Sequence, residues 1–366
     1  MKQPRIRAPI RIFTTTLVLA LLAAATAAFD ARADDPQGAS SHNMRLVGTN
    51  DLQARSTYQP TLHKYSRNRY ILFAGHHALG LQGEGLFPGA VTLPSFNPLT
   101  GKNELNGTSI LDVSDPRHPK YLFHLPVSDK ASGGAQMVRV CDGSTLPIRN
   151  NKVYMLRTYA NSAHEIWDVT DPSNPVGVRT VVGGNPVIGA DTGTPGALAG
   201  THKSWWECDT GIAYIVGRRG NDTADGWRVG NHIFIFDLSN PASPVFLRDW
   251  ALDGQQPGGV IPPHFTEVPS IHGPISTGPA GGAIELAGAT ADRVYFAYGT
   301  GSNGVMQIVN RTNLLSTKCG SILSTLTPPA CTDFHTAELG RLIMNPDNGG
   351  SHQLADRPYR CPGFRD

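Results

Sequence analysis

The sequence predicts an all-β protein built as a β-propeller of four-stranded antiparallel blades. Three observations support this prediction: a turn-rich composition, a strand–turn–strand motif that recurs along the chain, and no convincing helical pattern between the copies. The 366 residues include 40 glycines and 28 prolines, together about 19% of the chain against about 12% in an average protein. This content is typical of short strands joined by many loops and argues against a helical bundle.

The recurring motif joins an apolar run to an Asp, a small polar residue, an Asp-Pro or Asn-Pro pair and a second proline. Its copies start at Ile110 (ILDVSDP), Ile166 (IWDVTDP), Ile235 (IFDLSNP) and, in decayed form without proline, Ile308 (IVNRTNL). The apolar run predicts a buried strand, and the proline starts a turn because it presets φ. We expect the first aspartate of each intact copy to cap that turn by accepting backbone N–H groups: Asp112, Asp168 and Asp237. Each copy therefore predicts a hairpin.

Flanking apolar segments extend each hairpin to four strands. The expected second strands are residues 69–74, 152–157, 212–217 and 293–298, and the expected fourth strands are 120–125, 176–181 and 245–250. Candidate first strands precede three of the second strands, at 136–141, at 202–208 and in the stretch after His272. The pattern predicts four recognisable blades.

Both ends of the repeat region predict an incomplete ring. Residues 43–48 resemble an outer strand without its blade, and after the fourth copy only residues 340–344 and 350–352 suggest a partial fifth blade. Propellers normally close their rings because closure removes exposed strand edges. We therefore expect a truncated or frame-shifted member of a longer family.

The motif copies resemble LVIVD repeats, which occur in secreted bacterial β-propellers. The resemblance covers roughly residues 44–315 and departs from the family in its long insertions and its degenerate fourth copy. It implies the propeller fold and export. The family is largely uncharacterised, so the resemblance implies no particular activity.

The N-terminus predicts a secretory signal peptide over residues 1–33. Basic residues precede the apolar run 17–25, and Ala31-Arg32-Ala33 matches an A-x-A cleavage site. The apolar run is shorter than the roughly 20 residues that span a bilayer, so we expect no membrane anchor after cleavage. The remaining boundaries are a linker at 34–43, the propeller at 44–345 and an Arg/Pro-rich tail at 346–366. The mature protein should be periplasmic or extracellular.

Removal of this leader also changes the net charge. It takes five basic residues and one acidic residue from the 31 Lys+Arg and 29 Asp+Glu of the full chain, so the formal charge falls from +2 to −2. The mature chain lacks the basic excess that nucleic-acid binding requires.

The five cysteines predict disulfides because an exported chain meets an oxidising compartment. Cys319 and Cys331 flank a short loop and form the first candidate pair, whereas Cys141 and Cys208 occupy similar places in successive repeats and form the second. Cys361 is left over.

Histidines are the most informative polar residues of the sequence. His202, His272 and His352 fall near the starts of successive units, and His63 is a candidate fourth member. Converging neutral imidazoles would bind a transition metal such as zinc, copper or iron at the mouth of the central channel. We favour the alternative that each histidine bonds a neighbouring blade, because repeat-spaced residues usually have architectural roles.

Two further pairs are candidate ligand-binding residues. His76 and His77 end a strand and precede a Gly-rich insertion, which could form a loop at the channel mouth. Trp205 and Trp206 offer aromatic surface for a sugar or an aromatic ligand, although strand alternation sends only one of the two rings inward.

These features favour a non-catalytic scaffold that binds a protein or small molecule. The alternative is a metal-dependent enzyme that uses the channel-mouth histidines, and a third reading is a non-functional remnant. The sequence lacks a G-x-S-x-G elbow, an H-E-x-x-H motif, a P-loop and a G-x-G-x-x-G turn. The cofactor, the ligand and any catalytic residues stay open.

Overall fold

The computed structural model places most of the repeat region. The residues that it describes are 45–76, 94–127, 135–160, 163–185, 189–190, 198–199, 201–219, 227–228, 230–261, 269–279, 291–299, 304–316 and 337–343. The chain divides into two units, Met1–Val47 and Gly48–Asp366. Arg45–Val47 form no strand or helix, and all the described strands and the helix belong to the second unit.

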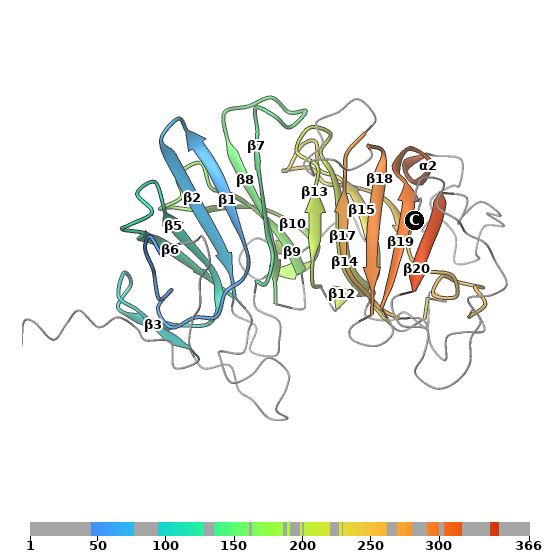
Figure 1. The fold of residues 1–366 in the computed structure, drawn as a ribbon, viewed down its shortest axis with the longest axis horizontal. Helices are drawn as coiled ribbons and strands as arrows, with labels where there is room; N and C mark the ends of the chain where they lie inside the picture. The colour runs from blue at the N-terminus through green and yellow to red at the C-terminus, as the bar shows by residue number, and fades with distance from the viewer. Residues whose placement is uncertain are drawn as a thin grey trace, which may run out of the picture. The chain divides into compact units, whose positions relative to one another are not determined.

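Four antiparallel sheets follow one another along the chain (Figure 1). The first contains β1 (Tyr58–Ser66), β2 (Arg69–Gly75), β5 (Gly107–Asp112) and β6 (Lys120–Pro126). The second contains β7 (Val138–Asp142), β8 (Val153–Tyr159), β9 (Ala163–Asp168) and β10 (Val176–Asn185), with β11 (Gly189–Ala190) added at its edge. The third contains β13 (Ser204–Trp206), β14 (Ile212–Arg219), β15 (His232–Asp237) and β16 (Val245–Trp250), with β12 (Leu198–Ala199) also paired to β14. The fourth contains β17 (Ile271–Ser276), β18 (Arg293–Tyr298), β19 (Val305–Asn310) and β20 (Glu338–Ile343).

The motif copies form the third strands and the turns that end them. β5, β9 and β15 each bury five consecutive residues and end at a half-buried aspartate. The carboxylates of Asp112, Asp168 and Asp237 accept hydrogen bonds from the backbone N–H two residues later, at 2.9, 3.0 and 2.8 Å. These backbone N–H groups bond to a side chain and not to the neighbouring strand, so the strand ends and the chain turns there.

The sheets pack face to face as propeller blades. Their first strands, β1, β7, β13 and β17, are neighbours in turn, so we call them the inner strands. One apolar core joins sheets one and two through Phe73 and Met155, and another joins sheets two and three through Leu156 and Phe234. A third core joins sheets three and four through Trp250 and Phe296. The predicted all-β propeller of four-stranded blades is confirmed.

Two parts of the fold differ from the sequence-based expectation. Residues 340–343 belong to β20 and complete the fourth sheet, so they do not start a fifth blade. Residues 45–50 form no strand, whereas the sequence pattern predicted one at 43–48. The outward face of the fourth sheet keeps Ile275 and Leu342 exposed, and no further blade covers it among the residues placed in the structure.

Two short elements were not expected from the sequence. A hairpin of β3 (Ser95–Asn97) and β4 (Lys102–Glu104) lies in the insertion between β2 and β5. The degenerate fourth copy leads into a helix, α2 (Arg311–Leu315), where Asn310 Oδ1 accepts from the N–H of Asn313 as an N-cap. A helix can start here because this copy lacks the proline that the other copies carry. No helix in the described ranges has the length and apolarity to cross a membrane.

Candidate functional site

The inner strands all begin at the same end, which brings residues from different blades together. We call the four segments 58–62, 135–139, 201–205 and 270–274 the entry end. Lys203 Nζ, just before β13 in the third blade, donates a hydrogen bond to the hydroxyl of Tyr58 in the first blade at 3.0 Å. His202 of the third blade stacks on His272 of the fourth, with ring centroids 4.9 Å apart and planes 25° from parallel. Three blades therefore meet at this cluster.

Lys203 is the central residue of the entry end. It is only 7% exposed, and its ammonium also lies 5.1 Å from the centre of the Tyr58 ring. Its stem passes over Gly273, where an added Cβ would lie 3.0 Å from Lys203 Cδ. Gly273 therefore provides the space that the lysine stem occupies.

The entry end contains basic residues but no acidic ones. The segments contain Arg139, His202, Lys203 and His272 but neither aspartate nor glutamate. Arg139 donates to the carbonyl of Ser204 at 3.3 Å and stacks on the Trp205 ring at 4.0 Å. Burial lowers the pKa of His272 below its usual value, and the charge of Lys203 lowers it further. His272 is therefore mainly a neutral imidazole at pH 7.

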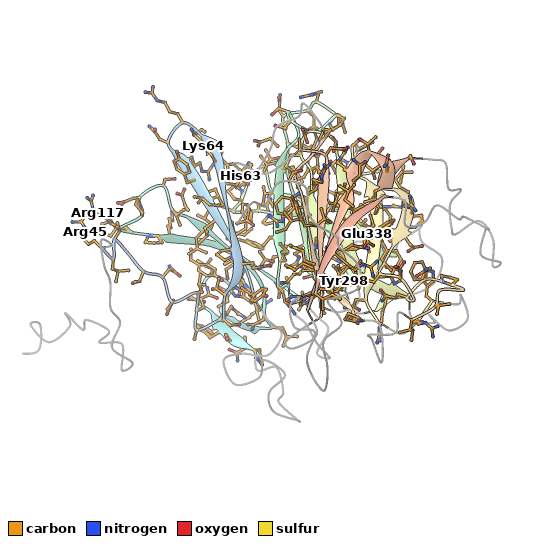
Figure 2. All side chains as sticks on the ribbon, turned by 45° about the vertical axis from the view of Figure 1, so that its right-hand side comes forward. Arg45, His63, Lys64, Arg117, Tyr298 and Glu338 are labelled. Atoms are coloured by element: carbon orange, nitrogen blue, oxygen red, sulfur yellow. A yellow bond between two sulfur atoms is a disulfide. The ribbon has the colours of Figure 1, made fainter. Side chains whose placement is uncertain are left out.

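The acidic residues of the inner strands lie at their other end. His63 on β1 (labelled in Figure 2) contacts the carboxylate of Asp142, at the end of β7, at 3.1 Å. Glu207, which follows β13, accepts Arg311 nitrogens at 2.8, 3.1 and 2.7 Å. Acidic residues therefore occur at this end of the inner strands and are absent from the four entry-end segments.

The structure brings together two of the four histidines proposed as metal ligands. His202 and His272 meet at the entry end, whereas His63 lies at the opposite end beside Asp142. His352 lies outside the described residues. Within the described segments, no three His, Cys, Asp or Glu side chains gather in a way that could hold a metal ion.

His76 and His77 follow β2. His76 is buried, its Nε2 lies 2.6 Å from the Ser109 hydroxyl, and its Nδ1 contacts the carbonyl of Ser56. It thus ties the third strand of the first blade to the segment before β1. His77 falls outside the residues that the structure places.

Trp205 and Trp206 point to opposite faces of the third blade, as strand alternation requires. Both rings are nevertheless buried, Trp205 in the core with sheet four and Trp206 in the core with sheet two. The expectation that only one ring turns inward was wrong, because a propeller blade is covered on both faces. Neither ring offers an exposed aromatic platform.

A disulfide joins Cys141 of β7 to Cys208, which follows β13, with Cα atoms 5.3 Å apart. It links the inner strands of the second and third blades and corresponds to the second candidate pair. Cys319, Cys331 and Cys361 lie outside the described residues.

Sequence reasoning missed Lys203, Tyr58 and Gly273. The only local signal was the position of Lys203 beside His202, at the start of a repeat unit. β1 itself was not anticipated, because its exposed and half-buried residues alternate without a continuous apolar run.

No protein-family model matches the chain, and no curated protein matches its sequence. Among solved structures, it is similar to a hypothetical selenium-binding protein from Sulfolobus tokodaii, at 15% identity and a TM-score of 0.39, over 69% of this chain and 51% of that one. It is also similar to fructan 1-exohydrolase IIa from Cichorium intybus, at 14% identity and a TM-score of 0.32, over 69% of this chain and 42% of that one. The chain thus covers 51% and 42% of the lengths of these proteins.

Proposed function

We propose that this chain is an exported β-propeller of the LVIVD-repeat type, and that it acts as a non-catalytic binding scaffold in the periplasm or at the cell surface. We place its ligand site at the entry end of the inner strands. The observation that carries this proposal is the convergence of Lys203, Tyr58, His202 and His272 from three blades. Binding residues commonly sit where a rigid scaffold brings distant segments together.

Export is supported by the leader-like residues 1–33 and by the Cys141–Cys208 disulfide. Disulfides persist in oxidising compartments and are rare in the cytosol. The test is the intact mass of protein recovered from the periplasmic fraction. We expect a mature chain that begins at Asp34 with Cys141 and Cys208 oxidised, and cytosolic protein with an intact leader would contradict export.

Ligand binding at the entry end is tested by thermal-shift screening of carboxylates, phosphates, sugars and divalent metals. We expect at least one class to raise the Tm of the wild type but not that of the double variant His202→Ala/His272→Ala. A matched control is His118→Ala, which changes an exposed histidine paired with Asp115. A panel in which no class shifts the wild type would reject the site.

A metal-dependent enzyme is the second candidate, and the stacked His202–His272 pair is the observation that favours it. Two imidazoles are a common part of zinc and copper sites. Metal analysis of the purified protein discriminates the two functions. Stoichiometric zinc, copper or iron that is lost in the double histidine variant would support the enzyme.

A further inference from the structure

Lys203 differs from the other buried cations of the structure in how its charge is satisfied. Arg157 and Arg311 each reach a carboxylate, of Glu165 and Glu207 respectively. Arg55 donates to three oxygens and Arg248 to two. Among the residues that the structure describes, Lys203 contacts one oxygen acceptor, the Tyr58 hydroxyl, and takes part in none of the ion pairs.

An ammonium group carries three N–H donors and prefers acceptors for all of them. Burying a charge without a counter-charge costs several kcal/mol, so such a group normally has a partner of opposite sign. At the entry end, the hydroxyl of Tyr58 satisfies one donor. A bound anion would accept hydrogen bonds from the remaining N–H donors and would neutralise the charge of the ammonium.

The surroundings of Lys203 favour an anion over a cation. Arg139, His202 and His272 lie in the same segments, and those segments contain no acidic residue. A metal cation at the His202–His272 pair would be repelled by the neighbouring ammonium, since Coulomb energy between close charges is large where water is excluded. The same charge attracts a carboxylate or a phosphate.

The cluster is also reachable. Tyr58, His202 and His272 are half-buried rather than buried, so the cluster has a solvent-facing side. An imidazole N–H can donate to an oxygen of a ligand placed beside it, as at His272. Gly273 leaves room for the lysine stem because it has no side chain.

We infer that the entry end binds a small oxyanion, the carboxylate or phosphate group of a small molecule, with Lys203 as its charge partner and with His272, stacked on His202, as a flanking donor. This inference rests on the proposed function, which places the ligand site at this end, and adds the chemical class of the ligand.

The test is titration of the full mature protein with inorganic phosphate and, separately, with succinate, at ionic strength held constant with NaCl. Binding is followed by calorimetry and by Tm. We expect saturable binding of at least one anion. Its Kd should rise roughly tenfold or more in Lys203→Met, because the free energy of a hydrogen bond to a charged group corresponds to about this change in affinity. The two titrations distinguish a phosphate ligand from a carboxylate ligand.

Lys64→Met is the matched control, because Lys64 is an exposed lysine on β1 and lies over the Tyr70 ring. It should bind the anion as the wild type does. Lys203→Arg keeps the charge and should retain most of the affinity, so it serves as a second variant if Lys203→Met folds poorly. Without added anion, Lys203→Met should melt at or above the wild-type temperature, because it removes a buried charge.

Equal anion affinity in the wild type and Lys203→Met would overturn the inference. So would zinc binding that depends on His202 and His272 without any anion binding, although that result would leave the proposed ligand site standing. Absence of binding by phosphate, succinate, sugars and divalent metals alike would reject both the inference and the proposed site.

Discussion

Lys203 donates a hydrogen bond to the hydroxyl of Tyr58, a residue 145 positions earlier in the chain. The bond joins the third blade to the first at 3.0 Å and connects inner strands that are not direct neighbours along the chain. This contact lies at the centre of the entry end. It makes the position of the lysine depend on the relative placement of the blades.

Tyr58→Phe should therefore destabilise the protein by about 1–3 kcal/mol, because a buried ammonium loses an oxygen acceptor. The effect should shrink in the Lys203→Met background, where no ammonium remains. Urea unfolding of the four proteins in this double-mutant cycle measures the coupling. Additive effects would show that the hydrogen bond contributes nothing to folding.

Gly273→Ala should displace Lys203, because the added Cβ would lie 3.0 Å from Lys203 Cδ. We expect a destabilisation of about 1–2 kcal/mol, typical of mild overpacking, and a smaller effect when Lys203 is replaced by alanine. Gly340→Ala is the control, since a Cβ there meets nothing within 4 Å. Equal melting temperatures for Gly273→Ala and the wild type would show that the stem adjusts freely.

The Cys141–Cys208 disulfide should contribute about 4 kcal/mol to stability on the loop-closure estimate, given its sequence separation of 67 residues. Cys141→Ala/Cys208→Ala should lower the free energy of unfolding by this order. A reducing agent should destabilise the wild type and leave the double variant unchanged. If reduction affects both proteins equally, another disulfide or a nonspecific effect is responsible.

Glu207 and Arg311 form a buried ion pair between the third and fourth blades. Glu207 also accepts from the Tyr214 hydroxyl at 3.0 Å and the Ser276 hydroxyl at 2.5 Å. Arg311→Met should cost about 3–5 kcal/mol, because it leaves a buried carboxylate without its cation. Arg311→Met/Glu207→Gln should recover part of that loss.

Arg69→Met is the matched control for this pair. Arg69 and Asp112 are 3.7 Å apart and partly exposed, so we expect a loss of at most about 1 kcal/mol. Chemical denaturation of all four proteins measures the comparison. Similar losses for Arg311→Met and Arg69→Met would show that the buried Glu207–Arg311 pair stabilises the protein no more than an exposed pair does.

His164 should make stability fall in acid. Burial lowers its pKa to about 4, and its hydrogen bond to the carbonyl of Val216 offsets this only in part. In the unfolded chain this histidine has an ordinary pKa of about 6.5. Between about pH 6.5 and pH 4 the unfolded chain therefore binds a proton at this histidine that the folded chain does not bind. Stability is therefore full above about pH 6.5 and declines as the pH falls toward 4.

His164→Gln should flatten this pH dependence, since glutamine does not titrate and can still donate to Val216. The free energy of unfolding at pH 4.5 and pH 7 gives the slope for each protein. His118→Gln is the control, because it replaces an exposed histidine with the same residue. An unchanged slope in His164→Gln would mean that other groups cause the acid sensitivity.

The strand pattern was accessible from the sequence because it depends on short-range chemistry. The apolar residues that precede Asp112 and Asp237 predict buried third strands, and the Asp-Pro or Asn-Pro pairs that follow predict turns. β1 was missed because its side chains alternate between half-buried and exposed without an apolar run. β20 was assigned to another blade because a long insertion separates it from β19.

The site was less accessible for a different physical reason. The sequence singled out histidines by their repeat positions, and His202 and His272 do meet, but His63 lies five residues along β1 from Tyr58, at the other end of the strand. Repeat spacing does not specify which end of an inner strand a side chain occupies unless the strand register is known. Trp205 and Trp206 were misjudged in a similar way, since only face-to-face packing shows that both sides of a blade are covered.

The sequence by itself therefore determined the all-β class, the blade hairpins and their aspartate-ended turns, because each depends on residues a few positions apart. Only the tertiary structure decided that Lys203, Tyr58 and the His202–His272 pair converge, that Gly273 makes room for the lysine, and that Cys141 bonds Cys208. These contacts join different blades. They follow from the packing of one sheet on the next, which local chain chemistry does not specify.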